Sequence, residues 1–217
     1  MGLFLKLNLS KKRRIKMKTR KRRTMKTYKT FLIFCEGKTE KDYFDSIPKR
    51  GKNITVKGIG KGTSELFKKA KNLSKEFERK NDITFDEKWL VFDKDDFDDF
   101  DDAINDAQKE GFEVAYSNPC FEIWFLLHFQ YIDSSLNSNA ICDKVCKLIG
   151  NPCQRCEDIK SRINMYEILS EDQLSEAIKH AEKLLSKFAN VSPSKSNPST
   201  RVHLLVGALK ANNQINE

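Results

Sequence analysis

The sequence has no apolar run close to the roughly 20 residues that a membrane-spanning helix needs. The apolar start MGLFLKLNLS is not expected to be a secretory signal, because a basic stretch rather than a small-residue cleavage site follows it. These absences argue against a membrane protein and a secreted one, and they predict a cytoplasmic location. The six cysteines are then expected to be reduced thiols.

Acidic residues are missing from the first 35 positions, where basic residues are concentrated. The net charge is +9, but residues 1–30 hold 13 Lys or Arg, which leaves 27 basic against 31 acidic residues after them. We expect residues 1–27 to form a disordered basic tail, because like charges repel and apolar residues are few. Such a tail suits phosphates of RNA or DNA; a solubilising extension is the alternative. The residues expected to bind nucleic acid are Lys12, Arg13, Arg14, Arg20, Lys21, Arg22 and Arg23.

Apolar runs of strand length alternate with amphipathic helices over the next hundred residues. Strands are expected at 31–36, 53–58, 88–93 and 112–117, and helices at 39–47, 98–110 and from 119 onward. A long amphipathic helix is also expected after the turn at 60–64, with Leu66, Phe67, Ala70, Leu73 and Phe77 on its apolar face. This order predicts an α/β fold with a parallel sheet of about four strands flanked by helices. After residue 137 only helices are expected, at 137–149, 156–169, 171–188 and 201–210. We therefore predict one domain at 28–133, followed by a helical C-terminal region at 134–217.

Acidic residues stand where the first and third strands end. Glu36 closes the run FLIFCE, and Asp93 and Asp95 follow the run WLVF. The carboxyl ends of parallel strands meet at one edge of a sheet, where carboxylates can hold Mg²⁺ or Mn²⁺ against a phosphate. We predict such a metal site at these three residues, suited to phosphodiester cleavage. The alternative is that the acids only cap helices.

The apolar helix expected in SNPCFEIWFLLHF carries two polar groups, Glu122 and His128. Glu122 is a candidate metal ligand or general base, because a carboxylate buried without a partner is costly. His128 lies farther along and is expected to be a core histidine, with a functional role as the alternative. Lys38 and Lys94 are candidates for contact with the scissile phosphate. The remaining candidates are Glu40, Asp96 and Asn118.

Three neighbouring patterns have simpler explanations. The acids at 98, 99, 101 and 102 are expected to face water at a helix start, where they suit the helix dipole. The acidic run is not a calcium loop, because Phe97 takes its fifth position and no Gly follows. GIGKGTS lacks the Gly-Lys-Ser/Thr ending of a phosphate loop, so it is expected to be a tight turn.

Four cysteines near the middle of the chain have the spacing C-x3-C-x6-C-x2-C. They are Cys142, Cys146, Cys153 and Cys156. Four thiolates could hold a structural Zn²⁺. However, only the last pair has standard knuckle spacing, and the first two also fit the buried face of a helix. Four reduced cysteines without zinc are therefore the main expectation.

The segments CEGKTEKDYF, FDKDDF, SNPCFEIWFLLHF and NPSTRVHLLV together resemble the RloB-like family of phage-defence proteins. CEG-x-TE and Asp-x-Asp also occur across the wider Toprim superfamily, and SNPCFEIWFLLHF narrows the resemblance to this family. It spans residues 31–206 and implies a Toprim-like fold, with a metal site at Glu36, Asp93 and Asp95. Larger Toprim enzymes commonly have Glu where this chain has Phe97, so a second metal would need Glu40, Asp96 or Glu122.

The resemblance further implies a divalent-metal-dependent nuclease that acts on RNA or DNA in antiviral defence by abortive infection. An ATPase of the ABC or AAA type is the partner it implies. The alternative is a non-catalytic nucleic-acid-binding or adaptor subunit of a defence complex that contains such an ATPase.

Overall fold

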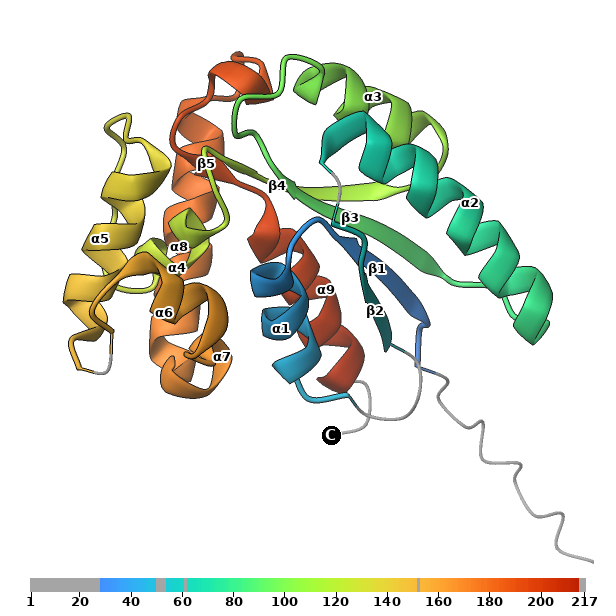
Figure 1. The fold of residues 1–217 in the computed structure, drawn as a ribbon, viewed down its shortest axis with the longest axis horizontal. Coiled ribbons are helices and arrows are strands. Elements are labelled where there is room, and N and C mark those ends of the chain that lie inside the picture. Colours follow the sequence, from blue (N-terminus) through green and yellow to red (C-terminus); the bar gives the residue numbers. More distant parts are fainter. Residues whose placement is uncertain (1–27, 50–53, 61, 152, 215–217) are drawn as a thin grey trace, which may run out of the picture.

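A five-stranded sheet, in the order β2-β1-β3-β4-β5, forms the centre of the molecule (Figure 1). The computed structural model describes residues 28–49, 54–60, 62–151 and 153–214. Four strands run parallel: β1 (Phe31–Cys35), β2 (Ile54–Gly58), β3 (Glu87–Asp93) and β4 (Glu113–Asn118). The short strand β5 (Ser199–Thr200) is antiparallel to β4. The predicted α/β fold with four parallel strands is confirmed, and β5 is an addition from a segment expected to lie between helices.

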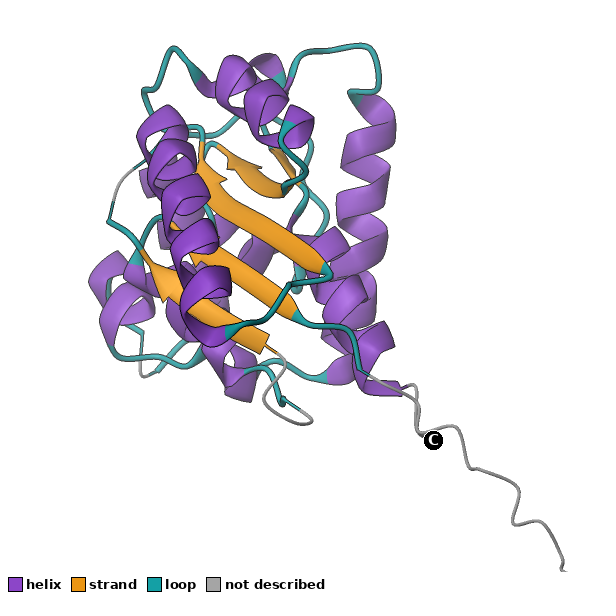
Figure 2. Cartoon of the chain, turned by 90° about the vertical axis from the view of Figure 1, so that its right-hand side faces the viewer, coloured by secondary structure: helices purple, strands orange, loops and turns teal. Residues whose placement is uncertain are grey.

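Helices cover both faces of the sheet, because successive side chains of each strand point to opposite faces. Leu32 and Phe34 of β1 pack with α2 (Thr63–Asn81) and α3 (Phe100–Lys109). Phe31 and Ile33 point the other way, into a cluster with α1 (Lys38–Ser46) and α9 (Val202–Gln214). Figures 1 and 2 show these helices on either side of the strands. Every side chain of β1 is therefore buried, as expected for a central parallel strand.

The remaining helices gather beside the sheet (Figure 1). They are α4 (Glu122–Leu127), α5 (Ser138–Ile149), α6 (Cys156–Ser161), α7 (Met165–Ile168) and α8 (Glu171–Lys187), with the 3₁₀ turn η1 (Pro193–Lys195) after them. The single helix expected at 156–169 is broken into α6 and α7, because the Asp158 carbonyl accepts hydrogen bonds from both Arg162 N and Ile163 N. Side chains from α4, α5, α8 and α9 share one hydrophobic cluster with β1 and β3. The domain boundary near residue 133 stays a prediction.

The expectation of reduced cysteines in the C-terminal region is wrong for this structure. Disulfides join Cys142 to Cys156 and Cys146 to Cys153. The first cysteine of each pair lies on one face of α5, because residues four apart in a helix are neighbours. The chain folds back after α5, so the two pairs have Cα–Cα distances of 5.3 and 5.2 Å, which suit a disulfide. Cys35 and Cys120 are free and buried.

Two further predictions concern the membrane and the tail. No helix within the described ranges combines the length and the apolar character that crossing a bilayer requires. The predicted basic tail, with its seven candidate nucleic-acid-binding residues, lies outside the described residues.

Candidate metal centre

Glu36 and Asp93 lie side by side because β1 and β3 are neighbours in the sheet. Cys35 is opposite Val91 in the parallel register, and Glu36 N donates to the Val91 carbonyl over 2.9 Å. One residue farther on, the Glu36 carboxylate accepts a hydrogen bond of 3.3 Å from Asp93 N. The predicted adjacency of these two strand ends is confirmed.

Glu40 and Glu122 bring two more carboxylates to the same place. Glu40 lies in the first turn of α1, the helix that follows β1, and Glu122 begins α4 after β4. Both are buried, with exposed fractions of 5% and 4%. Each raises the pKa of Asp93 by its charge, so the three groups lie within electrostatic range of one another. We call the set Glu36, Glu40, Asp93, Asp95 and Glu122 the acidic site.

Two carboxylate oxygens of the acidic site have no partner. Asp93 Oδ1 and Glu40 Oε2 are buried, and neither has a hydrogen-bond partner among the residues that the structure describes. Burial, with the charge of Glu122 and Glu36 adding to it, raises the pKa of Glu40 to about 7. Burial and the charges of Glu40, Glu122 and Asp95 raise the pKa of Asp93 well above its usual value. Such buried acids are costly unless a cation neutralises them.

Asp95 lies at the open side of the acidic site. The backbone of Asp95 has a positive φ of 36°. Its N–H donates a hydrogen bond of 3.2 Å to the Pro119 carbonyl, which connects the loop after β3 to the loop after β4. Desolvation raises the pKa of Asp95, and the charges of Asp96 and Glu122 add to the effect. Lys160 and Lys94 oppose it. Asp96 is exposed and acts on Asp95 through this charge.

Glycines let the backbone approach two of the carboxylates. A Cβ on Gly37 would lie 2.7 Å from Glu40 Oε2, and one on Gly62 would lie 2.8 Å from Glu36 Oε1 and 2.5 Å from the Phe97 ring. In addition, Gly60 has a positive φ of 69° and its N–H donates to the Glu36 carbonyl over 2.9 Å. Gly60 and Gly62 therefore bring the backbone close to the acidic site, whereas the tight turn expected for GIGKGTS includes Lys61, which lies outside the described residues.

Lys160 is the site residue that sequence reasoning missed most clearly. It projects from α6, and its Nζ lies 3.8 Å from Glu122 Oε1. Nothing around it in the sequence marks it, because its position depends on how the segment between α5 and α6 folds back. Cys120 was also missed: burial raises the pKa of its thiol, and the charges of Glu122 and Asp93 add to the effect.

Three of the sequence candidates have other partners. Lys38 is exposed and pairs with Asp42 one turn along α1. The Asn118 amide donates to the Pro193 carbonyl at 2.8 Å and the Ser194 carbonyl at 3.1 Å, which fastens the η1 turn to the end of β4. His128 Nδ1 is 2.8 Å from the Trp124 carbonyl, and burial lowers the pKa of His128 to about 4, as expected for a core histidine.

Lys94 turns back to the loop that carries it. Its Nζ donates to the carbonyl oxygens of Phe97 at 2.6 Å and Asp95 at 3.4 Å. It therefore braces the turn after β3 and also places a positive charge near Asp95.

The acids at the start of α3 were expected to face water, but two of them form hydrogen bonds with other parts of the chain. Asp99 accepts a hydrogen bond of 2.7 Å from Thr63 Oγ1 and so joins the starts of α2 and α3. Asp101 accepts from Ser194 N at 2.9 Å and from Ser194 Oγ at 2.5 Å. Their role is to join loops above the carboxyl ends of the strands.

The donor atoms are oxygens, the type that a hard divalent cation prefers. Carboxylates at the ends of two strands and in the first turns of two helices act on one another by their charge, and within the described residues no three of them bring their oxygens within 4.8 Å of one another. Two of their oxygens are buried without a partner in the described part of the chain. Mg²⁺ and Mn²⁺ take such ligands. The four cysteine sulfurs, in contrast, are bonded to one another in pairs, so the zinc site stays a prediction for the reduced protein.

The fold and this site define a class: a parallel α/β protein with a carboxylate cluster at the carboxyl ends of its strands. A family model described as RloB-like protein matches residues 31–209, and the chain belongs to this family. The resemblance found in the four sequence segments is thereby confirmed. Neither the curated proteins nor the solved structures contain a match to the chain.

Proposed function

We propose that this RloB-like protein is a divalent-metal-dependent nuclease that cleaves phosphodiester bonds of RNA or DNA. The observation that carries the proposal is the pair of buried, unpartnered oxygens on Asp93 and Glu40 within the acidic site. A protein does not keep such groups for stability, because each costs free energy until a cation meets it. Their position at the carboxyl ends of parallel strands is where α/β proteins bind ligands.

Glu36, Asp93 and Asp95 would hold Mg²⁺ or Mn²⁺, and Glu40 or Glu122 would complete the ligand set. A metal ion bound there would polarise a phosphoryl oxygen and lower the pKa of a coordinated water. The protein's own contribution is the arrangement of the carboxylates on rigid strand ends. Glu40, with a pKa of about 7, also suits a group that accepts a proton from water near neutral pH.

The test uses the full chain with labelled tRNA, single-stranded RNA and plasmid DNA, each with Mg²⁺, with Mn²⁺ or with EDTA. We expect one of these nucleic acids to be cut with either metal and not with EDTA. Glu36→Gln and Asp93→Asn should abolish the cleavage, whereas Asp143→Asn, at an exposed position of α5, should not. Cleavage that persists in EDTA or in both site variants would refute the metal-dependent nuclease.

Nucleic acid and an ATPase are the partners we propose. The basic tail would add sequence-independent affinity, so deleting residues 1–26 should weaken binding and flatten its dependence on salt. On duplex DNA the slope should fall by about 0.9 for each phosphate that the tail neutralises. The turnover number at saturation should survive, because the tail contains no acidic residue. An unchanged salt slope would remove the tail from the nucleic-acid interface.

A role in antiviral defence beside an ABC- or AAA-type ATPase rests on the family and on no contact in this chain. If wild-type protein binds nucleic acid without cutting it under every metal condition, the non-catalytic adaptor becomes the better description. Co-purification with an ATPase encoded in a neighbouring reading frame tests that partnership, and phage plaque counts with Asp93→Asn test whether the acidic site is needed for defence.

A further inference from the structure

Among the residues that the structure describes, Lys160 is the basic residue that forms an ion pair with a carboxylate of the acidic site. Its side chain is 53% exposed, whereas that of its neighbour Glu122 is 5% exposed, so the ammonium group lies at the boundary between the site and solvent. The separation of 3.8 Å from Glu122 is longer than a charge-assisted hydrogen bond of about 2.8 Å. Among the described residues, no hydrogen bond uses its three donors. The group is therefore available to another anion.

The other two lysines considered for phosphate contact are occupied. Lys38 pairs with Asp42, and Lys94 donates to the carbonyl oxygens of Asp95 and Phe97. Lys160 instead lies 3.8 Å from Glu122, and its charge also lowers the pKa of Asp95 against the neighbouring acids. This contrast favours Lys160 as the phosphate contact.

A groove leads to Lys160 from outside. A cavity of about 350 Å³ lies between α1 and the α6–α7 segment, and Lys160 forms part of its wall. Polar side chains of Thr39, Ser161 and Asn164 line it, and so does Arg162. The acids Asp42 and Asp45 in the same wall are already paired with lysines of the α1 region. Lys160 is thus shared by the groove and the acidic site.

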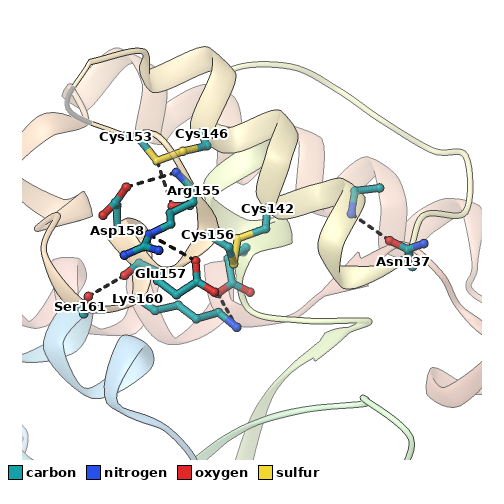
Figure 3. The surroundings of a disulfide bond; sticks show 12 residues. Asn137, Cys142, Cys146, Cys153, Arg155, Cys156, Glu157, Asp158, Lys160 and Ser161 are labelled. Carbon is teal, nitrogen blue, oxygen red and sulfur yellow. Dashed lines mark hydrogen bonds and ion pairs between the residues drawn. A yellow bond between two sulfur atoms is a disulfide. The ribbon is translucent and has the colours of Figure 1, made fainter.

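The Cys142–Cys156 disulfide holds Lys160 in this place. Cys156 is the first residue of α6, and Lys160 is four residues later, on the same face of the helix. The sulfurs of Cys142 and Cys156 and a carboxylate oxygen of Glu122 lie within 4.8 Å of one another. Figure 3 shows Lys160 on α6 together with both disulfides, of which Cys142–Cys156 includes the first residue of α6 and Cys146–Cys153 includes a residue that precedes this helix. The cross-link therefore fixes the face of α6 that meets Glu122.

We propose that Lys160 contacts the phosphate group that the substrate presents to the acidic site, and that the Cys142–Cys156 disulfide positions it there. The inference rests on the proposed nuclease function and names a further substrate-binding residue for it. Cys142 and Cys156 are positioning residues, because they act through Lys160.

The first experiment compares Lys160→Met, Lys160→Arg and the control Lys179→Met, which changes an exposed lysine of α8. Binding of the three nucleic acids named above is measured with Ca²⁺ in place of Mg²⁺, over a range of salt, and cleavage is measured with Mg²⁺. Lys160→Met should weaken binding and raise KM about tenfold, the effect of losing one hydrogen bond between charged groups, with a smaller change in kcat. It should also lower the salt slope by about 0.7 to 0.9.

Lys160→Arg should recover most of the affinity, and Lys179→Met should match the wild type. A Lys160→Met protein with unchanged affinity and KM would overturn the proposal. The proposal would also be overturned by a Lys160→Arg protein whose melting curve shows that it is folded and whose affinity for nucleic acid is as low as that of Lys160→Met. The comparison of Arg with wild type keeps the test valid even if the Met variant does not fold.

Failure of the nuclease proposal looks different from failure of this one. Nucleic acid that binds in a Lys160-dependent way but is never cut refutes the nuclease and keeps the phosphate contact. Metal-dependent cleavage that Lys160→Met leaves unchanged does the reverse.

The second experiment tests the disulfide with the double variant Cys142→Ser/Cys156→Ser, alone and combined with Lys160→Met. If the cross-link acts by positioning Lys160, removing it should weaken nucleic-acid binding when Lys160 is present. The same removal should cause no further loss in the Lys160→Met protein. Cys146→Ser/Cys153→Ser is the matched control, and its effect on binding should be smaller. Additive losses in the combined variant, or four free thiolates that hold Zn²⁺ in the protein as purified, would overturn the positioning role.

Discussion

Acidic side chains have opposite environments in the acidic site and in the cross-linked segment from Cys142 to Arg162. Asp158, 6% exposed, accepts hydrogen bonds from Gln154 N and Arg155 N at 3.0 and 3.1 Å and lies 3.5 Å from Arg162. These partners lower the pKa of Asp158. Asp93 has a buried oxygen without any described partner and a raised pKa. An acid whose oxygens accept hydrogen bonds stabilises its surroundings, whereas an acid with a buried, unpartnered oxygen can bind a ligand.

The largest effect that separates the two regions should be on cleavage. Asp93→Asn removes a metal ligand and should lower kcat/KM about 1000-fold, which exceeds the 10- to 100-fold typical of residues that only support a ligand. Asp158→Asn should leave kcat/KM within about threefold, because it acts on the start of α6 rather than on the metal. Steady-state cleavage of the substrate identified above measures both. Equal losses in the two variants would show that the acidic site has no special role.

The contrast also explains what the sequence could predict. Apolar runs such as FLIFC and WLVFD identify β1 and β3, and parallel pairing places Glu36 beside Asp93 provided that these two strands are neighbours, as the structure shows. Glu122 stands out because it is an acid within an apolar helix. These residues lie on elements whose type and neighbours follow from local patterns.

Lys160 and the disulfide pairing could not be predicted in this way. Both depend on the direction in which the chain returns after Gly150, which has a positive φ of 70°. The burial of Glu40 was equally hidden, because an acid in the first turn of a helix ordinarily suits the helix dipole in solvent. Local sequence does not encode which neighbours withdraw a side chain from water.

The cross-linked segment should contribute the largest effect on stability. The outer disulfide closes a loop with a sequence separation of 14, for which the loss of chain entropy in the unfolded state corresponds to about 3 kcal/mol. Reduction should therefore lower the free energy of unfolding by about that amount in chemical denaturation. The inner disulfide lies within the same loop, so the two contributions should not add fully.

A thiol count checks the starting state of that experiment. In denaturant without reductant, Cys35 and Cys120 should give two titratable thiols, and reduction should give six. Six thiols before reduction would contradict the disulfides and return the zinc prediction to first place.

The acidic site should make the metal-free protein less stable as the pH rises. Glu40 has a pKa of about 7 when folded and about 4.5 when unfolded, so the folded protein binds more protons in this range. The free energy of unfolding should fall by about 2 kcal/mol between pH 5.5 and pH 8. Saturating Mg²⁺ should remove most of this loss, because metal binding releases the proton.

Denaturation in EDTA and in Mg²⁺ at the two pH values measures this effect. Glu40→Gln is the control, since it keeps the shape of the side chain and removes the titrating group. A wild-type profile that is flat in EDTA would show that Glu40 is not held protonated, and the same slope in Glu40→Gln would assign the effect to another group.

The smallest effect should come from Asp158, and its sign should be opposite to that of the acidic site. Asp158→Ala removes the acceptor for Gln154 N and Arg155 N at the start of α6 and should lower the melting temperature by a few degrees. Asp158→Asn keeps an oxygen that can accept these bonds and should lower the melting temperature less.

The contribution of Asp158 to stability should depend on pH. Because its partners lower the pKa of Asp158, this contribution is present above its ordinary pKa and is lost as the pH falls through the lowered value. In metal-free protein at pH 8, Asp93→Asn should instead raise the melting temperature, since it removes a charge that burial disfavours and whose Oδ1 has no described partner. Thermal melts in EDTA compare the variants directly. Changes of the melting temperature with the same sign for Asp158→Ala and Asp93→Asn would contradict the distinction between hydrogen-bonded acids and acids with an unpartnered oxygen.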